Sequence, residues 1–285
     1  MQKAPIVVVE CPRDAMQGIH EFIPTLQKIA YLNALLQVGF NVLDFGSFVS
    51  PKAIPQMKDT KEVLEALEES PTELLAIIAN ERGAREAVSY SRISYLGFPL
   101  SVSETFQQRN TNMNITQALE VVKTIQELCV AANKRLVVYL SMGFGNPYGD
   151  PWNVEVVESF VFKLAPLEIS IISLADTIGS ADPQDIKMLF SRLIPQFPGI
   201  EFGAHFHAAP NAWRDKLEAA WEGGCRRFDG ALKGFGGCPY AKDELVGNIA
   251  TENILHFIET KGEKLNINFS ALQHALQLAL TIFPR

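Results

Sequence analysis

The sequence predicts an α/β protein, a (β/α)8 TIM barrel with an extra C-terminal helix, and three observations favour this fold class. Eight short apolar runs alternate with eight segments of helical periodicity, at a repeat of roughly 30 residues, as a barrel of parallel strands requires. Histidines and charged residues follow the ends of several runs, where the active sites of such barrels lie. The first run is followed by Cys11-Pro12-Arg13-Asp14, whereas a doubly wound open sheet would favour a glycine-rich phosphate turn there.

The predicted strands are short runs of β-branched and other apolar residues. The first contains Ile6-Val7-Val8-Val9, a continuous β-branched run of the kind that is buried on both faces of a parallel sheet. In chain order, the predicted strands cover 5–10, 40–45, 74–79, 93–98, 136–140, 169–174, 200–207 and 226–231. The stretches between them are long enough for the helical crossovers that join parallel strands.

The predicted helices show apolar residues at intervals of three and four. In 24–38 this period is closed by Gly39, a residue that commonly follows the end of a helix. The other predicted barrel helices cover 61–67, 81–90, 116–132, 154–164, 183–194, 211–221 and 247–261. Asp182 precedes a first-turn proline, Pro183, and is expected to cap the helix that begins there.

One more helix is predicted over 270–282, and it is apolar enough to need a partner surface. Packing across the bottom of the barrel and a homodimer contact are both consistent with its pattern. No linker, low-complexity run or change of composition divides the chain. We therefore expect one catalytic TIM-barrel domain over 1–285.

The composition is that of an ordinary globular protein, with 47% hydrophobic and 20% charged residues. A net charge of −7 without basic clusters argues against a nucleic-acid partner. No apolar run reaches the ~20 residues that span a bilayer, and the N-terminus lacks the layout of a signal peptide. The cysteines, Cys11, Cys129, Cys225 and Cys238, are widely separated and read as reduced thiols. We expect a soluble cytoplasmic protein without a membrane partner.

Two histidines, His205 and His207, stand one residue apart at the end of the seventh predicted strand. Side chains alternate along a strand, so both rings are expected on the same face. Such a pair can bind one divalent metal ion if a carboxylate or an amide completes the set of ligands. A half-buried strand with two hydrogen-bonded histidines is the alternative.

Other ionisable residues collect at the same end of the predicted barrel. Arg13 and Asp14 follow the first strand, Asp44 lies in the second and Asp176 follows the sixth. Each alone has an ordinary explanation, because an aspartate can cap a turn and an Arg–Asp pair is most often a surface ion pair. Their repetition at four strand ends, with the histidine pair, favours a functional site.

The loop after the eighth predicted strand contains three glycines followed by Cys238. It reads either as a tight turn with a buried thiol, or as a lid that carries a thiol able to exchange protons over the site. Further on, Asn248 opens the predicted helix over 247–261. Its side chain could cap this helix or give its amide oxygen to a cation.

These motifs together resemble those of the 3-hydroxy-3-methylglutaryl-CoA lyase family, in family order and over nearly the whole chain. The histidine pair alone is a weak signal, but Gly236-Gly237-Cys238-Pro239-Tyr240-Ala241 and Ser47-Phe48-Val49-Ser50-Pro51 are specific to this branch of metal-dependent barrel lyases. The remaining matches are Glu10-Cys11-Pro12-Arg13-Asp14 with Gln17, Pro55-Gln56-Met57, Asp176-Thr177-Ile178-Gly179 and Gly247-Asn248-Ile249-Ala250-Thr251-Glu252.

The resemblance implies a small-molecule acyl-CoA substrate and a divalent cation, typically Mg²⁺ or Mn²⁺. The ligands would be Asp14, His205, His207 and Asn248. The implied reaction is retro-aldol cleavage of 3-hydroxy-3-methylglutaryl-CoA to acetyl-CoA and acetoacetate, a step of leucine degradation and ketone-body metabolism. The family likewise forms homodimers.

The resemblance also implies the catalytic residues. Arg13 would bind the thioester carbonyl, and Cys238 would serve as acid or base as the loop closes. Asp176 would assist the proton transfers or orient a ligand. His205 and Asp44 complete the expected catalytic set, and Asp44 stands where the family usually has glutamate.

Some positions near the expected acyl site depart from the family pattern. Ala15 and Met16 replace Gly-Leu, and Ala208 replaces the aspartate that usually follows the histidine pair. A related lyase acting on a different 3-hydroxyacyl-CoA therefore stays open, as does a Claisen-type enzyme that joins acetyl-CoA to a 2-oxo acid. A barrel that has lost catalysis and serves as a binding protein is a third reading, against which the retained motif residues speak.

Overall fold

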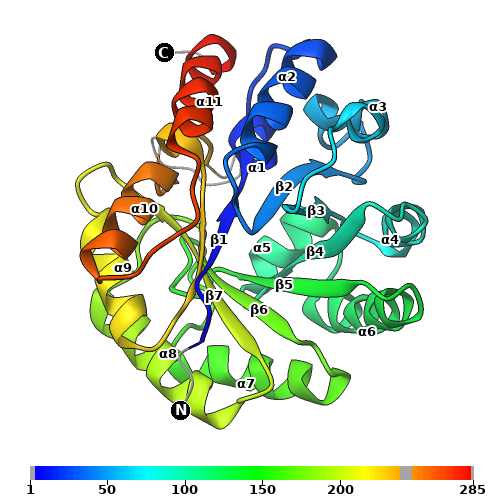
Figure 1. Ribbon diagram of the computed structural model, residues 1–285. Coiled ribbons are helices and arrows are strands. Elements are labelled where there is room, and N and C mark those ends of the chain that lie inside the picture. The colour runs from blue at the N-terminus through cyan, green and yellow to red at the C-terminus, as the bar shows by residue number, and fades with distance from the viewer. Residues whose placement is uncertain (1–3, 238–245, 284–285) are drawn as a thin grey trace.

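The computed structural model describes residues 4–237 and 246–283, and its centre is a closed barrel of parallel strands (Figure 1). Each strand pairs with the next in the chain, and the ring closes where β8 pairs with β1. The barrel strands are β1 (Val7–Glu10), β2 (Val42–Ser47), β3 (Glu73–Ile77), β4 (Ile93–Ser101), β5 (Arg135–Ser141), β6 (Ile171–Asp176), β7 (Glu201–Ala208) and β8 (Arg227–Gly230). The predicted TIM barrel is confirmed.

Helices surround the barrel in Figure 1, as the alternating pattern predicted. They are α2 (Thr25–Leu36), α3 (Thr60–Ala66), α4 (Glu81–Val88), α6 (Ile115–Ala131), α7 (Val154–Leu164), α8 (Pro183–Gln196), α9 (Trp213–Glu222) and α10 (Thr251–Thr260). The expected cap is present, since the Asp182 side chain accepts a hydrogen bond from the Gln184 backbone at 2.7 Å. None of the described helices is long and apolar enough to cross a membrane.

Several short elements escaped prediction. Two are α-helices, α1 (Pro12–Gln17) and α5 (Glu104–Thr111), and three are 3-10 turns, η1 (Pro55–Met57), η2 (Ala165–Leu167) and η3 (Leu232–Gly234). Helix α1 starts at a proline, where the missing N–H costs nothing, and it places Asp14 in its first turn. Helix α5 buries only two residues, so it carries no apolar period to read.

The predicted helix over 247–261 is wrong in its first four residues. Gly247–Asn248 forms a short strand, β9, that pairs antiparallel with β7 and places Asn248 opposite His207. The Ile249 backbone N–H donates to the Phe206 carbonyl, so the chain stays extended here, and α10 begins only at Thr251. Asn248 therefore caps no helix and stands beside the histidine pair.

The apolar residues form two layers, because side chains alternate between the two faces of each strand. A small cluster fills the barrel interior, with Val9, Leu75 and Val137 among its members. A much larger cluster lies between the strands and the surrounding helices. The barrel is thus a packed core, and it leaves room for chemistry only at the strand ends.

The C-terminal helix α11 (Phe269–Ile282) packs beside α2 on the flank of the barrel (Figure 1). The Asn268 backbone N–H, at the start of α11, donates to the Val38 carbonyl at 2.8 Å. After the helix, the Phe283 ring stacks on Phe235 in the loop that follows β8, with centroids 4.5 Å apart. The apolar face is therefore covered by the flank of the barrel, not by its bottom. A homodimer stays a prediction.

Candidate active site

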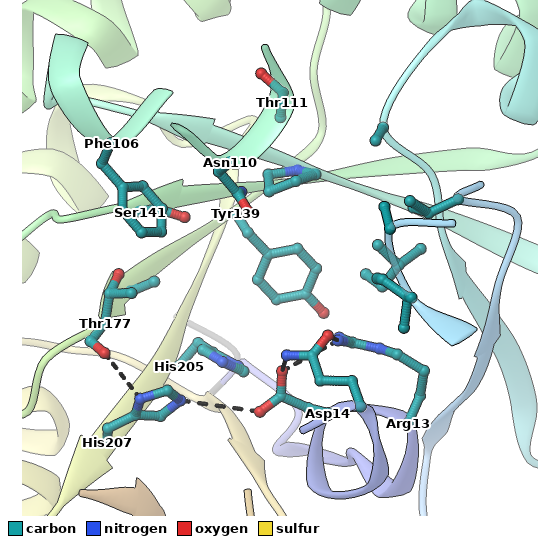
Figure 2. Close-up of a pocket in the computed structure, with 18 residues that line it drawn as sticks. Arg13, Asp14, Phe106, Asn110, Thr111, Tyr139, Ser141, Thr177, His205 and His207 are labelled. Atoms are coloured by element: carbon teal, nitrogen blue, oxygen red, sulfur yellow. Dashed lines mark hydrogen bonds and ion pairs between the residues drawn. The ribbon is translucent and has the colours of Figure 1, made fainter. Parts of the chain in front are cut away.

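A cavity of about 180 Å³ opens at the C-terminal ends of the barrel strands (Figure 2). One end is polar, with Arg13, Asp14 and Gln17 from α1 facing the two histidines of β7. The remaining lining residues are Val49, Ala53, Ile54, Ile77, Ala79, Pro99, Phe106, Asn110, Thr111, Tyr139, Ser141, Ala175 and Thr177. Arg13, Asp14, His205 and His207 therefore lie together at the end of the barrel where the sequence placed them.

Asp14, His205 and His207 form a compact group at the polar end. One ligand atom of each lies within 4.8 Å of those of the other two, and all three side chains are buried. The two histidines share a face of β7 because they are two residues apart on a strand. Three such ligand atoms could hold one metal ion, and the shared face predicted for the histidines is confirmed.

The ring of His207 has a fixed orientation. Its Nδ1 lies 2.9 Å from the Thr177 carbonyl oxygen, which can only accept, so Nδ1 carries the proton. Its Nε2 is buried, has no hydrogen-bond partner among the described residues and lies 3.9 Å from Asp14 Oδ2 (Figure 2). Burial lowers the pKa of His207 and favours the neutral ring. A neutral ring with a free Nε2 is the form that binds a metal.

His205 is oriented by a different group. Its Nδ1 lies 3.2 Å from Oδ2 of Asp229, a buried residue of β8. Burial acts to lower the pKa of His205, but the Asp229 carboxylate outweighs it and the pKa is raised. A carboxylate behind a histidine is a common support of a metal ligand, because it fixes the ring and increases its basicity.

Asn248 completes the group from β9. Its amide nitrogen donates to Asp14 Oδ2 at 2.7 Å and to the Phe235 carbonyl at 3.0 Å. Its amide oxygen is buried and accepts no hydrogen bond from the described residues. A buried, unpaired acceptor beside a carboxylate and two imidazoles fits a divalent cation. The expected ligand set is therefore chemically suited to such an ion.

Arg13 is held by two carboxylates. Its Nη2 donates to Asp44 Oδ2 at 2.6 Å, and its Nη1 donates to Asp14 at 3.1 Å and to Gln17 at 2.8 Å. Burial raises the pKa of Asp44 to about 6, with Arg13 opposing the shift. Burial acts likewise on Asp14, but the charges of Arg13 and the histidines prevail and lower its pKa. Asp44 faces inward because it alternates with Leu43 and lies two residues after the interior residue Val42.

Asp176 does not line the cavity. Its carboxylate accepts hydrogen bonds from the backbone N–H groups of Ser180 and Ala181 and from the ammonium of Lys216, and it is 1% exposed. The neighbouring Thr177 faces the cavity instead. The catalytic role expected of Asp176 stays a prediction, and so does that of Cys238, which lies outside the described residues.

Three residues in or behind the site were not predicted: Tyr139, which lines the cavity, and Asp229 and Lys216, which support the histidines from outside it. Asp229 could have been found, because an aspartate at an inward position of a predicted strand is unusual. Tyr139 lines the cavity, and its hydroxyl is buried without a hydrogen-bond partner among the described residues. The sequence places Tyr139 in an apolar strand, and nothing in that pattern indicates that its side chain lines a cavity.

The fold and the site define a TIM-barrel protein that gathers a carboxylate and two imidazoles, the ligand types of a divalent metal ion, at its strand ends. A family model described as HMGL-like matches residues 5–279, and the chain belongs to this family. The resemblance found in the sequence is thereby confirmed.

Relatives cover most of the chain. The hydroxymethylglutaryl-CoA lyase YngG of Bacillus subtilis is 32% identical over 93% of this chain and 88% of its own. A 3-hydroxy-3-isohexenylglutaryl-CoA/hydroxy-methylglutaryl-CoA lyase of Pseudomonas aeruginosa is 30% identical over 93% of this chain and 87% of its own. The structure of an HMG-CoA lyase from Acinetobacter baumannii, in complex with coenzyme A and 3-methylmalate, superposes with a TM-score of 0.90. That protein is 32% identical, over 98% of this chain and 91% of its own.

Proposed function

We propose that this protein is a carbon–carbon lyase that cleaves 3-hydroxy-3-methylglutaryl-CoA to acetyl-CoA and acetoacetate. The observation that carries the proposal is the group of Asp14, His205 and His207, with the unpaired amide oxygen of Asn248 beside them, at the polar end of the cavity. In a chain of the HMGL-like family, this arrangement fits the reaction for which its relatives are named.

Asp14, His205, His207 and Asn248 would hold Mg²⁺ or Mn²⁺. When bound, such a cation supplies Lewis acidity to oxygens of the substrate. The site is organised in advance, because the Thr177 carbonyl and the Asp229 carboxylate fix the two rings and the Asn248 amide donates a hydrogen bond to Asp14. This organisation reduces the movement that binding requires.

The reaction breaks the bond between C2 and C3 of the substrate. The proton of the C3 hydroxyl leaves, a carbonyl forms at C3, and the electron pair of the broken bond passes to C2 and the thioester oxygen. Arg13 lies at the cavity and is held by Asp44 through Nε and Nη2. We assign it to the negative charge that develops on the thioester oxygen.

Two proton transfers remain, one from the C3 hydroxyl and one to C2. We assign the second to the Cys238 thiol, which belongs to the glycine loop after β8. His205, at the cavity, pairs with Asp229 through Nδ1 and would hold the cation through Nε2, so its part in the reaction would be that of a ligand. Asp44 would act by holding Arg13, and Asp176 by orienting a ligand.

The wall opposite the polar end is apolar. Ile77 of β3, Pro99 of β4, and Val49 and Ile54 of the loop after β2 line it. Such side chains would accept the methyl and methylene groups of the acyl chain and exclude water from the reacting carbon. The products would place the enzyme in leucine degradation or ketone-body formation, in the cytoplasm.

The test is a coupled assay for acetoacetate from 3-hydroxy-3-methylglutaryl-CoA, with Mg²⁺, Mn²⁺ and a chelator run side by side. We expect cation-dependent cleavage, and a loss of kcat of roughly 10²–10³-fold in Arg13→Met, as for removal of one donor to a developing oxyanion. The kcat of Cys238→Ala should fall steeply as well.

A chain that binds the cation but forms no acetoacetate would contradict this substrate. Two further arms then separate the alternatives. A 3-hydroxyacyl-CoA with a longer branch at C3 tests for another acyl group, for which the P. aeruginosa relative is also named. Thiol release from acetyl-CoA with 2-oxo acids tests for a Claisen-type condensation.

A further inference from the structure

Lys216 of α9 is a buried lysine whose ammonium is fully used. It is 4% exposed and donates to three acceptors: Asp176 Oδ2 at 2.6 Å, the Gly179 carbonyl at 2.8 Å and the His207 carbonyl at 3.1 Å. An ammonium has three protons, so each proton has one acceptor. These contacts join the end of β6, the loop before α8 and the end of β7.

The loop after β6 is a closed turn built on the same carboxylate. Asp176 accepts the backbone N–H groups of Ser180 and Ala181, so the turn from 176 to 181 folds around its side chain. Within the turn lies Thr177, whose carbonyl oxygen accepts from His207 Nδ1 (Figure 2). The position of this turn therefore determines the direction of the His207 ring.

We propose that Lys216 is a positioning residue for His207. It joins the turn that holds the ring to the backbone of His207 itself, so that Nε2 keeps its place opposite Asp14. This inference rests on the proposed function only in taking His207 as a ligand of the cation. Lys216 acts through His207 and touches neither the cavity nor the site of reaction.

The charge of Lys216 alone and a positioning role predict opposite changes in cation affinity when Lys216 is replaced, so the proposal can be tested. A positive charge near a cation opposes its binding, so replacing Lys216 by methionine would strengthen cation binding if charge were its only influence. If Lys216 positions His207, the same replacement weakens binding. In the double variant Asp176→Asn/Lys216→Met one positive and one negative charge are removed, so the net charge is unchanged and only the geometry is affected.

The chain provides a matched control in a second buried pair. Lys28 is 2% exposed, lies 2.8 Å from Asp59 and also donates to the Gln56 carbonyl. It touches neither the turn at 176–181 nor His207. Lys28→Met therefore reproduces the loss of a buried ion pair, which costs stability by leaving a carboxylate unpaired, without disturbing the ligand.

The experiment is calorimetric titration of the apo-proteins with Mn²⁺, with unfolding in urea measured in parallel. We expect the Kd for Mn²⁺ to rise by roughly 10–100-fold in Lys216→Met and in the double variant, as for loss of a residue that supports a metal ligand. Lys28→Met should lose stability and keep the Kd of the natural chain. If Lys216→Met fails to fold, the double variant carries the test, because it leaves no unpaired carboxylate.

An unchanged or lower Kd in the Lys216 variants would overturn the proposal, and so would an equal rise in Lys28→Met. Both outcomes leave the proposed lyase function standing. If the natural chain itself binds no Mn²⁺, the proposed metal site is wrong, and the inference about Lys216 is wrong with it. Titration of the natural chain therefore distinguishes failure of the proposed function from failure of this inference alone.

Discussion

At the scale of single residues, Glu10 is a buried carboxyl outside the cavity. It is 0% exposed, accepts a hydrogen bond from the Leu232 backbone at 2.9 Å and is bonded to the Thr251 hydroxyl. Burial raises its pKa from 4.5 to about 8. Between pH 4.5 and about pH 8, Glu10 keeps its proton in the folded protein and loses it in the unfolded chain. The contribution of Glu10 to the free energy of unfolding therefore falls as pH rises, by up to about 1.4 kcal/mol per pH unit.

Glu10→Gln should remove this dependence, because an amide resembles the protonated acid and can make both hydrogen bonds. We expect the variant to match the natural chain near pH 4.5 and to become increasingly more stable than it up to about pH 8. Urea unfolding across this range measures the difference. The exposed Glu62→Gln is the control, and equal pH slopes in all three proteins would refute the assignment.

The residues of the site differ in how far the sequence could predict them. Asp14, Asp44 and the two histidines were predicted because each lies in a recognisable strand or shortly after one. Lys216 could not be predicted, because a lysine on an amphipathic helix ordinarily faces solvent. Its burial depends on a turn that arrives from another part of the chain.

At the scale of elements, the loop after β8 is fitted closely against the ligands. Gly236 has φ +101°, and a Cβ built there would lie 2.6 Å from the amide nitrogen of Asn248 and 3.1 Å from the Asp14 carbonyl. Both neighbours belong to the site, so neither can move without disturbing the expected ligand set. Position 236 requires glycine for two reasons: its φ is positive, and there is no room for a Cβ atom.

Gly236→Ala should therefore weaken Mn²⁺ binding and lower lyase activity by at least roughly 10-fold, the lower end of the range for disturbed support of a ligand. Gly262→Ala is the control, because Gly262 also has a positive φ, +76°, but has open space around its Cβ position. Calorimetry and the acetoacetate assay measure both variants. Similar losses in the two would mean that backbone strain alone is responsible.

The elements themselves were predicted where they carry an apolar period. The barrel strands and the helices around them follow this rule, and their ends differ from prediction by a few residues. Helix α5 and strand β9 carry no apolar period and were not predicted. Helix α5 is mostly polar, and β9 is a two-residue strand defined by its pairing with β7. Asn248 was therefore expected at the site but on the wrong element.

At the scale of the whole molecule, a bound cation should stabilise the fold. A ligand that binds only the folded chain at 100 times its Kd adds about 2.7 kcal/mol. For a chain of this size that corresponds to a rise in Tm of roughly 5–10 °C. We expect Mn²⁺ to produce this rise in a thermal melt, a chelator to reverse it and His207→Ala to abolish it. An equal rise in His207→Ala would place the cation elsewhere.

The hydrogen bond between Asn248 and Asp14 joins residues 234 positions apart in the chain. Closing so large a loop comes late in folding, because its entropy must be overcome before the contact forms. During synthesis, the amide follows every barrel strand out of the ribosome. The complete set of expected ligands is therefore assembled only when the barrel closes, and a cation that needs all four would bind the folded protein.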